Sequence, residues 1–344
     1  MNLQSLLFSF SFIALSAHAD TWNGYNDPSM MDVDHSYEFN LNKLPLQGTL
    51  DRMPWSETYW PTFRGSINYR WNAVDKDGFN YYPPTKDVVL HMSQADLMQL
   101  SPTEKYDIFM GHYDYPLHEE VRSYGNSGAP QWQGMCDGWS IAALQFSEPM
   151  PVTMANPDGV MVPFGSSDIK ALMTFAAAIH FEVETRQVGS KCEAKTGFGR
   201  QFSAACADIN PGALHVIMAN QFGIKKQGFV TERDPGYEVW NQPTYGFKST
   251  LMGSTNRGVR VHGTLFYTDE LDNSSWTPIV GTPAFKFDKI EMDYTLDLDD
   301  QGNIIGGSWI NGSDHPDFVW LPTNKLIFKD GLDGLNKLYQ ASGK

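Results

Sequence analysis

The sequence has few cysteines, few positive charges and no long apolar run beyond its first residues. Only three of its 344 residues are cysteine, and 25 lysines and arginines stand against 40 aspartates and glutamates, giving a net charge of −15. Binding to nucleic-acid phosphates requires clustered Lys and Arg, so this charge argues against a nucleic-acid partner. No later stretch is apolar and long enough to cross a bilayer, so we expect no membrane partner.

The apolar run that the chain does have, from Leu6 to Leu15, is followed by Ala17-His18-Ala19. Small residues at these positions are typical of a signal-peptidase site, and the run is too short to span a bilayer as a helix. We therefore predict a signal peptide over residues 1–19, cleavage near Ala19, and a secreted or periplasmic protein. Residues 20–52 are polar and lack a clear period, which predicts an extended or poorly ordered leader that could act as a pro-segment.

The cysteine count indicates one thiol that is free for chemistry. Export places the chain in an oxidising compartment, where three cysteines cannot all pair within one molecule. Cys192 and Cys206 flank a polar, glycine-containing segment, so we predict a disulfide between them. Cys136 is then unpaired. The alternative is that Cys136 is a small buried apolar residue without a chemical role.

Cys136 stands where a glycine-marked turn gives way to an apolar helix. Trp139, Ala142, Ala143 and Phe146 follow the i, i+3, i+4, i+7 spacing of a helix packed on a core. This spacing places Cys136 at a helix N-terminus, where free backbone N–H groups and the helix dipole favour a thiolate. We predict that Cys136 is a nucleophile.

A nucleophilic cysteine needs a base within hydrogen-bond reach and a third group that orients the base. His215 lies near the start of the apolar stretch ALHVIMAN and Asp234 ends GFVTERD, and both stretches have the composition of strands. If the chain turns between Ile224 and Lys225, His215 and Asp234 face each other across a hairpin, close enough for the carboxylate to hold one imidazole nitrogen. The alternative is an ordinary hairpin in which the histidine is structural and Asp234 belongs to a turn.

Other residues complete the predicted site. Gln133 or Gln131, just before the cysteine, could join the cysteine's backbone N–H in stabilising an oxyanion. Trp132, Trp240 and Asn241 are candidate substrate contacts, since aromatic walls that shed water suit an enzyme that must exclude hydrolysis.

The sequence gives weak support for a metal and none for another cofactor. Asp297, Asp299 and Gln301, followed by Gly302, loosely resemble a calcium loop, but Ser308 stands at the twelfth position in place of an acidic residue. A β-turn is therefore the favoured interpretation, and we predict no cofactor, with calcium as the weaker alternative.

The pattern of the whole chain indicates an α+β fold. Residues 53–130 form an aromatic and helical N-terminal segment, in which Ser101 and Glu104 make a capping box, and residues 131–344 form the predicted catalytic domain. A hairpin is indicated at Asp158-Gly159. The expected helices span Leu90–Leu100, Ser101–Phe109, Gly138–Phe146 and Ser166–Ile179, and strands are expected from Ala213 onward, over Val259–Tyr267, Ala284–Ile290, Met292–Leu298 and Ser308–Ile310.

Six blocks of the sequence together resemble the transglutaminase elicitor family, known from oomycete cell-wall proteins and some secreted bacterial proteins. They are PWSETYWP, SPTEKYDIFMGHYDYPL, WQGMCDGWSIAA, SDIKALMT, RDPGYEVWNQPTYGFK and IIGGSWINGSDHPDFVWLP. The segment GYEVWNQPTYGFK resembles the peptide of that family that plants recognise, with Thr244-Tyr245 in place of Val-Arg. Asp137 stands where the family has His.

The resemblance implies a papain-like or transglutaminase-like core, with a helical N-terminal half, an antiparallel β C-terminal half, and Cys136, His215 and Asp234 as nucleophile, base and orienting group. It further implies that the partners are proteins with accessible Gln and Lys side chains, which the enzyme joins by isopeptide bonds through a cysteine thioester. A papain-like cysteine protease or glutamine deamidase is the nearest alternative. A non-catalytic elicitor-like binding protein with an exposed WNQP loop is the alternative from another class.

Overall fold

The computed structural model describes residues 22, 24–191, 208–234, 236–256, 258–310 and 313–343. The predicted signal peptide and both cysteines of the predicted disulfide, Cys192 and Cys206, lie outside these residues. Within them, no helix is both long and apolar enough to cross a membrane.

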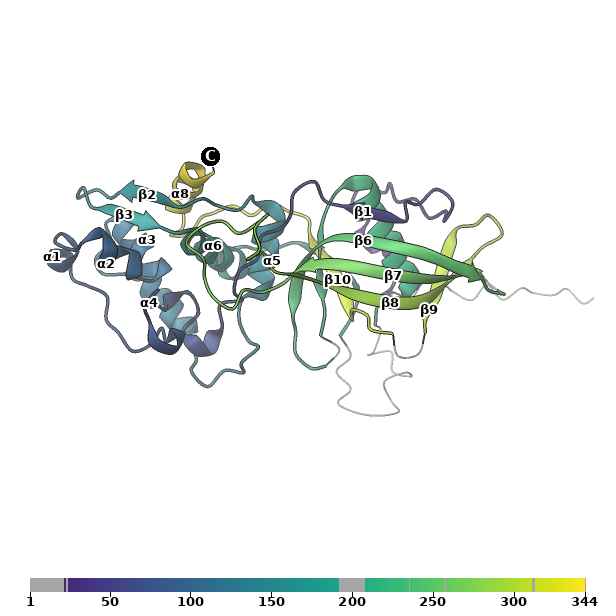
Figure 1. Cartoon of the computed structure of the whole chain (residues 1–344), viewed down its shortest axis with the longest axis horizontal. Coiled ribbons are helices and arrows are strands. Elements are labelled where there is room, and N and C mark those ends of the chain that lie inside the picture. The colour runs from purple at the N-terminus through teal and green to yellow at the C-terminus, as the bar shows by residue number, and fades with distance from the viewer. Residues whose placement is uncertain are drawn as a thin grey trace, which may run out of the picture.

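Helices gather at one end of the molecule and a large antiparallel sheet at the other, with α5 between them (Figure 1). A first hydrophobic core fills the helical end, and a second lies between the sheet and α7. The helices are α1 (Lys86–Val89), α2 (Gln94–Gln99), α3 (Pro102–Met110), α4 (Pro116–Tyr124), α5 (Cys136–Gln145), α6 (Ser166–Phe175), α7 (Pro211–Met218) and α8 (Gly334–Ser342), with π-helical turns over Ala176–His180 and Ala219–Lys225.

The main sheet has eight strands. Seven of them follow the order β4-β10-β5-β6-β7-β8-β9, and the eighth, β1, pairs with the part of β6 that comes after its pairing with β5. All of its pairings are antiparallel. Its strands are β1 (Gln47–Thr49), β4 (Thr185–Gly189), β5 (Phe229–Glu232), β6 (Asn241–Ser254), β7 (Gly258–Thr268), β8 (Phe287–Leu298), β9 (Ile304–Trp309) and β10 (Phe318–Pro322); β2 (Val152–Ala155) and β3 (Met161–Phe164) form a separate hairpin.

Several sequence predictions are confirmed in the helical end. The helix that begins at Cys136 is present, and so is the hairpin around Asp158-Gly159. The capping box is complete, because the Ser101 side chain accepts from the Glu104 N–H while the Glu104 carboxylate accepts from the Ser101 N–H. The helix expected over Leu90–Leu100 is shorter, since Ser93 caps a new helix at Gln94.

The stretch ALHVIMAN, predicted as a strand, is helical: it lies in α7 and the first residues of the π-helical turn that follows. All of its residues are buried, so apolar side chains occur at nearly every position. The sequence therefore shows no periodicity that could distinguish a helix from a strand. The helix begins because Asn210 accepts the Gly212 N–H at 2.9 Å and Pro211 occupies the first helical position. With α8, this helix places helical structure in the half of the chain that was expected to be strand.

The segment predicted as a poorly ordered leader is instead packed. Met31, Tyr37, Leu41 and Leu44 are buried in the second core, and β1 adds a strand to the main sheet. Its polar composition hid these apolar residues because they recur at irregular intervals. Residues 31–49 therefore contribute to the sheet end of the fold.

The segment over residues 53–83 has 3₁₀ turns at Thr62–Arg64, Ser66–Asn68 and Val74–Lys76 and otherwise irregular backbone. Trp55, Trp60 and Tyr69 are buried in the first core, as the aromatic composition indicated. This segment passes beside the start of α5, because the Met135 N–H donates to the Tyr59 carbonyl oxygen at 2.7 Å.

Candidate functional site

Cys136 is the first residue of α5, at the junction between the two ends of the molecule. Its side chain is 5% exposed and forms no disulfide. Two glycines let the chain approach closely here: an added Cβ at Gly134 would meet the Tyr59 carbonyl oxygen at 2.4 Å, and one at Gly138 would meet the Thr174 carbonyl oxygen of α6 at the same distance. The free thiol is therefore held at a tightly packed helix N-terminus.

The sulfur of Cys136 faces the residues that lead into β6. Its S–H donates to the Val239 carbonyl oxygen at 3.7 Å, and the side-chain amide of Asn241 donates to the sulfur at 3.9 Å. The side-chain carbonyl oxygen of Asn241 in turn accepts the indole N–H of Trp320, from β10, at 2.9 Å. Strands β6 and β10 thus bring an amide to the reactive atom of α5.

The structure holds this thiol in its protonated form. Burial raises the pKa of Cys136 to about 12, and the carboxyl groups of Asp137 and Glu270 act in the same direction. Hydrogen bonds from the backbone and side-chain N–H groups of Asn241 oppose this shift. The helix N-terminus alone led us to expect a lowered pKa, but loss of water around the sulfur outweighs that effect.

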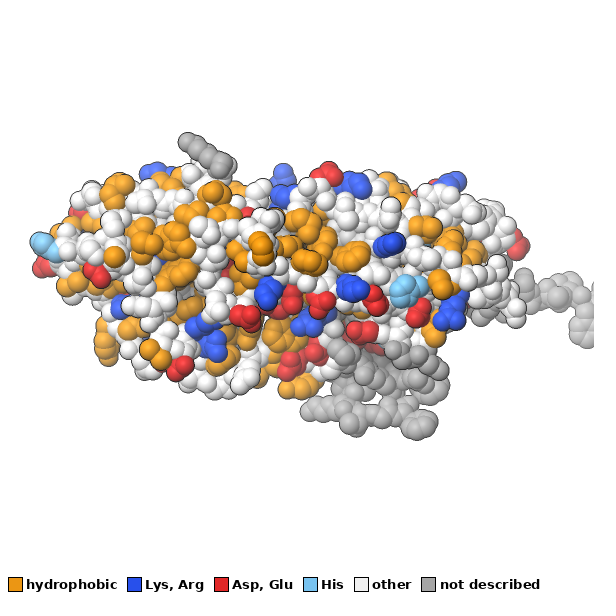
Figure 2. Space-filling model, viewed as in Figure 1, with side chains coloured by type: hydrophobic (Ala, Val, Ile, Leu, Met, Phe, Trp, Pro, Cys, Tyr) orange, Lys and Arg blue, Asp and Glu red, His pale blue; other side chains and the backbone are white. Residues whose placement is uncertain are grey.

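A pocket of about 310 Å³ opens beside the covered thiol. Tyr59 and Trp240 form an aromatic wall, with ring centroids 5.1 Å apart in an edge-to-face arrangement. Trp240 directly follows Val239, which accepts the Cys136 hydrogen bond. The charged residues of the lining are Arg64, Lys76, Arg233, Asp269, Glu270 and Asp272. Figure 2 likewise shows acidic and basic side chains intermixed on one face of the molecule, beside hydrophobic side chains.

Glu270 is a buried carboxyl group in the lining of this pocket. Burial raises its pKa, a side-chain hydrogen bond shared with Asp269 adds to the rise, and Arg233 opposes it. The Gln242 side-chain amide donates to the Glu270 carboxylate. A carboxyl group whose pKa is raised in this way is a candidate for acid–base chemistry. The sequence offered one signal for it, an acidic pair at the end of an apolar strand.

His215 does not lie near Cys136. Its ring is buried against the sheet, and Nδ1 lies 2.8 Å from the hydroxyl of Tyr294 on β8. Tyr294 on β8 pairs with Val261 on β7, and Val261 pairs with Leu251 on β6, so Tyr294 lies at the position of Leu251 along the sheet. The sulfur instead faces Asn241, at the start of β6. A strand extends about 3.3 Å per residue, so roughly 30 Å separates the two positions along β6. Burial lowers the pKa of His215 to about 4.

Asp234 is a turn residue and does not orient His215. Its carboxylate accepts the Gly236 N–H, and its backbone oxygen accepts the Lys191 ammonium at 2.9 Å. The predicted hairpin between ALHVIMAN and GFVTERD is therefore wrong, since β5 pairs with β6 and β10. Among the histidines that the structure describes, none lines the pocket or bonds to the sulfur.

The remaining predicted contacts fall in different places. Trp240 lines the pocket and Asn241 reaches the sulfur. Gln131 and Gln133 are exposed, and their backbone carbonyl oxygens accept from the Tyr59 hydroxyl and the Thr62 N–H, so their oxyanion role stays a prediction. Trp132 is half-buried, and its role as a substrate contact also stays a prediction.

The WNQP segment is not an exposed loop. Asn241 and Gln242 are buried at the start of β6, where Gln242 pairs with Thr231 of β5. The calcium-like segment is a turn, in which the Asp299 carboxylate accepts the Gln301 and Asn303 N–H groups. Among the described residues there is no cluster of three or more His, Cys, Asp or Glu side chains placed to hold a metal.

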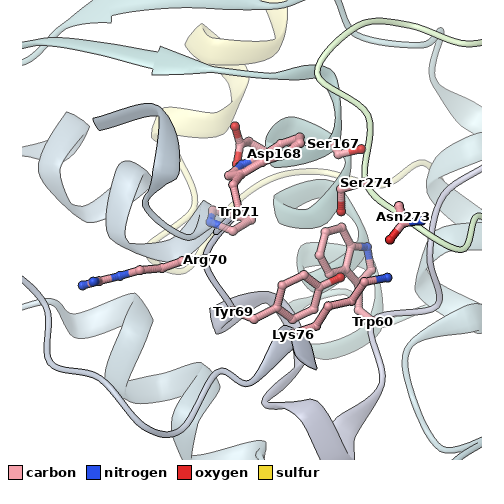
Figure 3. Close-up of a pocket in the computed structure, with 10 residues that line it drawn as sticks. Trp60, Tyr69, Arg70, Trp71, Lys76, Ser167, Asp168, Asn273 and Ser274 are labelled. Carbon is pink, nitrogen blue, oxygen red and sulfur yellow. The ribbon is translucent and has the colours of Figure 1, made fainter. Parts of the chain in front are cut away.

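A second cavity, of about 100 Å³, is lined by Trp71 and Ser274 and shares Lys76 with the pocket beside the thiol (Figure 3). Its floor includes Trp60 and Tyr69, and Asp168 at its far side is paired with Lys105 at 2.7 Å. Its volume is about a third of that of the pocket beside Cys136. That larger pocket also includes Trp240, next to the residue that accepts the Cys136 hydrogen bond, so it is the better candidate.

These observations define a class of protein: a mixed fold of helices and antiparallel sheet with a thiol-centred site where the two meet. The chain belongs to the transglutaminase elicitor family, whose model matches residues 31–270 and 278–330. The fold is similar to the crystal structure of the GP42 transglutaminase from Phytophthora sojae, with 25% sequence identity, a TM-score of 0.68, and coverage of 93% of this chain and 98% of that one. A comparison with curated proteins returned no match.

Proposed function

We propose that this protein is a protein-glutamine γ-glutamyltransferase that uses Cys136 as its nucleophile. The observation that carries the proposal is an unpaired cysteine at the start of α5, faced by Asn241 and bordered by the aromatic-walled pocket. Membership of the transglutaminase elicitor family and similarity to the GP42 transglutaminase support this reaction. A nucleophilic thiol at a helix N-terminus is also the arrangement of papain-like enzymes, to which we relate the core.

The reaction proceeds in two acyl transfers. The Cys136 sulfur, after losing its proton, attacks the side-chain amide carbon of a protein glutamine, and the C–N bond breaks as ammonia leaves with an added proton. The amine of a protein lysine then attacks the thioester, the C–S bond breaks, and the thiol regains a proton. The product is an isopeptide bond between the two side chains. Water in place of the lysine amine gives deamidation.

We assign the proton transfers to Glu270. Its carboxyl group lies in the pocket with Tyr59 and Trp240, and burial together with the hydrogen bond to Asp269 raises its pKa, which suits a group that acts as base and then as acid. The covered thiol must first become accessible, and the Val239 backbone oxygen accepts its S–H. Displacement of Val239 and the adjoining Trp240 by a substrate side chain would open the sulfur to the pocket.

We further propose that the protein is secreted. The support is the apolar run followed by Ala17-His18-Ala19, which lies outside the described residues. Mass measurement of the protein recovered from the culture medium tests this point, with cleavage after Ala19 as the expected result.

The test of the reaction is incorporation of a labelled primary amine into casein, a protein with accessible glutamines. We expect wild-type protein to incorporate label and Cys136→Ala to incorporate none. Glu270→Gln, which keeps the shape and removes the acid–base group, should slow incorporation by about a hundredfold or more. Glu291→Gln, an exposed carboxylate paired with Lys289 on β8, is the matched control and should keep the wild-type rate.

Other products identify the competing functions. Ammonia released without amine incorporation indicates a deamidase, and casein fragments indicate a protease. If casein takes up no amine, releases no ammonia and is not cleaved, the enzymatic proposal is contradicted and a binding protein of the same family is favoured.

A further inference from the structure

The side-chain amide of Asn241 has only one orientation that satisfies its neighbours. The indole N–H of Trp320 is a donor and cannot accept, so the atom of Asn241 that lies 2.9 Å from it must be the carbonyl oxygen. The amide nitrogen is then left on the other side, 3.9 Å from the Cys136 sulfur. Trp320 therefore decides that a donor, and not an acceptor, faces the reactive atom.

The backbone around Asn241 is also fixed. The Ser140 hydroxyl, one turn along α5 from the cysteine, donates to the backbone carbonyl oxygen of Asn241 at 3.0 Å. On the opposite strand, the Glu232 carboxylate accepts the Trp240 N–H at 3.2 Å. Asn241 is 7% exposed, so little water competes for its amide. The donor is thus preorganised before any substrate arrives.

A donor in this position has little effect on a neutral thiol, which is a weak acceptor, but a larger one on a sulfur that carries negative charge. The backbone N–H of Asn241 acts on the sulfur in the same direction as the side chain. The nearby charges do the opposite, since Asp137 and Glu270 are both acidic. Among the described neighbours of the sulfur, Asn241 is therefore the residue suited to stabilise a thiolate.

We propose that Asn241 is a catalytic residue that donates its side-chain N–H to the Cys136 thiolate, and that Trp320 is the positioning residue that sets the amide orientation. This assignment rests on the proposed function only in its use of Cys136 as nucleophile. The reactivity of the thiol can be measured without any acyl transfer, so the two proposals can fail separately.

The test is the rate at which iodoacetamide alkylates Cys136, followed by the mass of the peptide that contains it, at several pH values between 7 and 9.5. Asn241→Leu and Asn241→Asp keep nearly the shape of the asparagine, so access to the sulfur is matched. Asn241→Leu should lower the rate about tenfold, the usual effect of one hydrogen bond to a charged group. Asn241→Asp should lower it further, because it replaces the donor by a negative charge.

Trp320→Phe removes the indole donor and keeps an aromatic ring, so it frees the Asn241 amide to turn. We expect a decrease in alkylation rate smaller than that of Asn241→Leu. Trp309→Phe is the matched control, because Trp309 also donates its indole N–H within the protein, to the backbone oxygen of Ile209 at 3.0 Å, and lies on β9 at the other end of the strand order. It should leave the rate unchanged. Circular dichroism checks that all four variants are folded.

Two results would overturn the inference: an Asn241→Leu rate equal to or above that of wild type, or a Trp320→Phe rate equal to that of Trp309→Phe. If the alkylation rates follow the expected order but casein takes up no amine, Asn241 keeps its role at the thiol and the transferase proposal fails. If wild type incorporates amine while Asn241→Leu alkylates at the full rate, the transferase stands and the role of Asn241 is lost.

Discussion

Glu232 lies directly opposite Asn241 in the pairing of β5 with β6, and one oxygen of its buried carboxylate accepts three hydrogen bonds. That oxygen accepts the Asp234 N–H at 3.0 Å, the Trp240 N–H at 3.2 Å and the Lys191 ammonium at 3.0 Å. The carboxylate therefore ties together both ends of the turn between β5 and β6. The far end of that turn carries Val239, which covers the Cys136 thiol.

The first prediction concerns the pH dependence of stability. Burial raises the pKa of Glu232 to about 7, against 4.5 for the unperturbed group, so the folded protein binds more protons than the unfolded chain between these values. This group therefore stabilises the fold fully below pH 4.5, and its contribution is lost as the pH rises to 7. Glu232→Gln should reduce the difference in the free energy of unfolding between pH 5 and pH 8 by about 1–3 kcal/mol.

Urea unfolding of both proteins at the two pH values measures that difference. Glu270 shifts in the same direction, so wild type and variant should both retain some loss of stability toward pH 8. An unchanged difference in Glu232→Gln would show that the Glu232 carboxyl group titrates alike in the folded and unfolded protein.

The start of α5 could be predicted from the sequence because its signals are local. The spacing of Trp139, Ala142 and Ala143 describes one face of one helix, and all three side chains are buried in the first core. Cys136 was placed at the helix N-terminus by the same pattern. The local pattern does not reveal Val239, which is close in space but distant in the sequence and whose backbone oxygen accepts the S–H of the buried thiol.

The base could not be predicted because its identity depends on which segments meet in space. The choice of His215 assumed a strand, although Asn210 and Pro211 give a helix-start signal of the kind recognised at Ser101. Helix α7 then packs on the sheet and holds His215 against Tyr294 of β8, far from the thiol. Trp320 reaches Asn241 only because β10 and β6 lie on either side of β5, and no local pattern encodes that strand order.

The second prediction concerns the contact between α5 and α6. At Gly138 an added Cβ would lie 2.4 Å from the Thr174 backbone oxygen, so Gly138→Ala must push the two helices apart. We expect a loss of about 1–3 kcal/mol in the free energy of unfolding, together with faster alkylation of Cys136 because the packing above it loosens. Gly24→Ala, where an added Cβ meets nothing within 4 Å, is the control. Equal stability of the two variants would contradict the close packing at Gly138.

The third prediction concerns a buried ion pair between α3 and α6. Lys105 and Asp168 are both fully buried, with the ammonium 2.7 Å from the carboxylate, and Asp168 also accepts the Trp71 indole N–H at 2.9 Å. Lys105→Met leaves the carboxylate without its cation and should lower the free energy of unfolding by about 3–5 kcal/mol. The double variant Lys105→Met/Asp168→Leu should lose less than the sum of the single changes, as measured by urea unfolding. Additive losses would mean that the two charges do not interact.

The last prediction separates a structural N-terminal segment from a removable pro-segment. Residues 31–49 supply Met31, Tyr37 and Leu41 to the second core and strand β1 to the sheet. The Asn220 side chain also exchanges hydrogen bonds with the backbone N–H and oxygen of Glu38, at 2.9 Å each. Deleting residues 20–50 would expose these partners and leave their polar groups unpaired.

The deleted protein should therefore unfold at a temperature at least several degrees lower than the protein that begins at Asp20, and it should expose apolar surface to the dye ANS. Deletion of residues 20–24 alone is the control and should lower the unfolding temperature much less, because the one described side chain of this stretch that packs on the second core, Trp22, is only partly buried, and the first fully buried described residue of the segment is Asn26. A pro-segment would behave differently: its removal would leave a stable core with increased amine incorporation. Calorimetry and the casein assay on the same two deletions distinguish these outcomes, and a stable, more active protein lacking residues 20–50 would contradict the structural role.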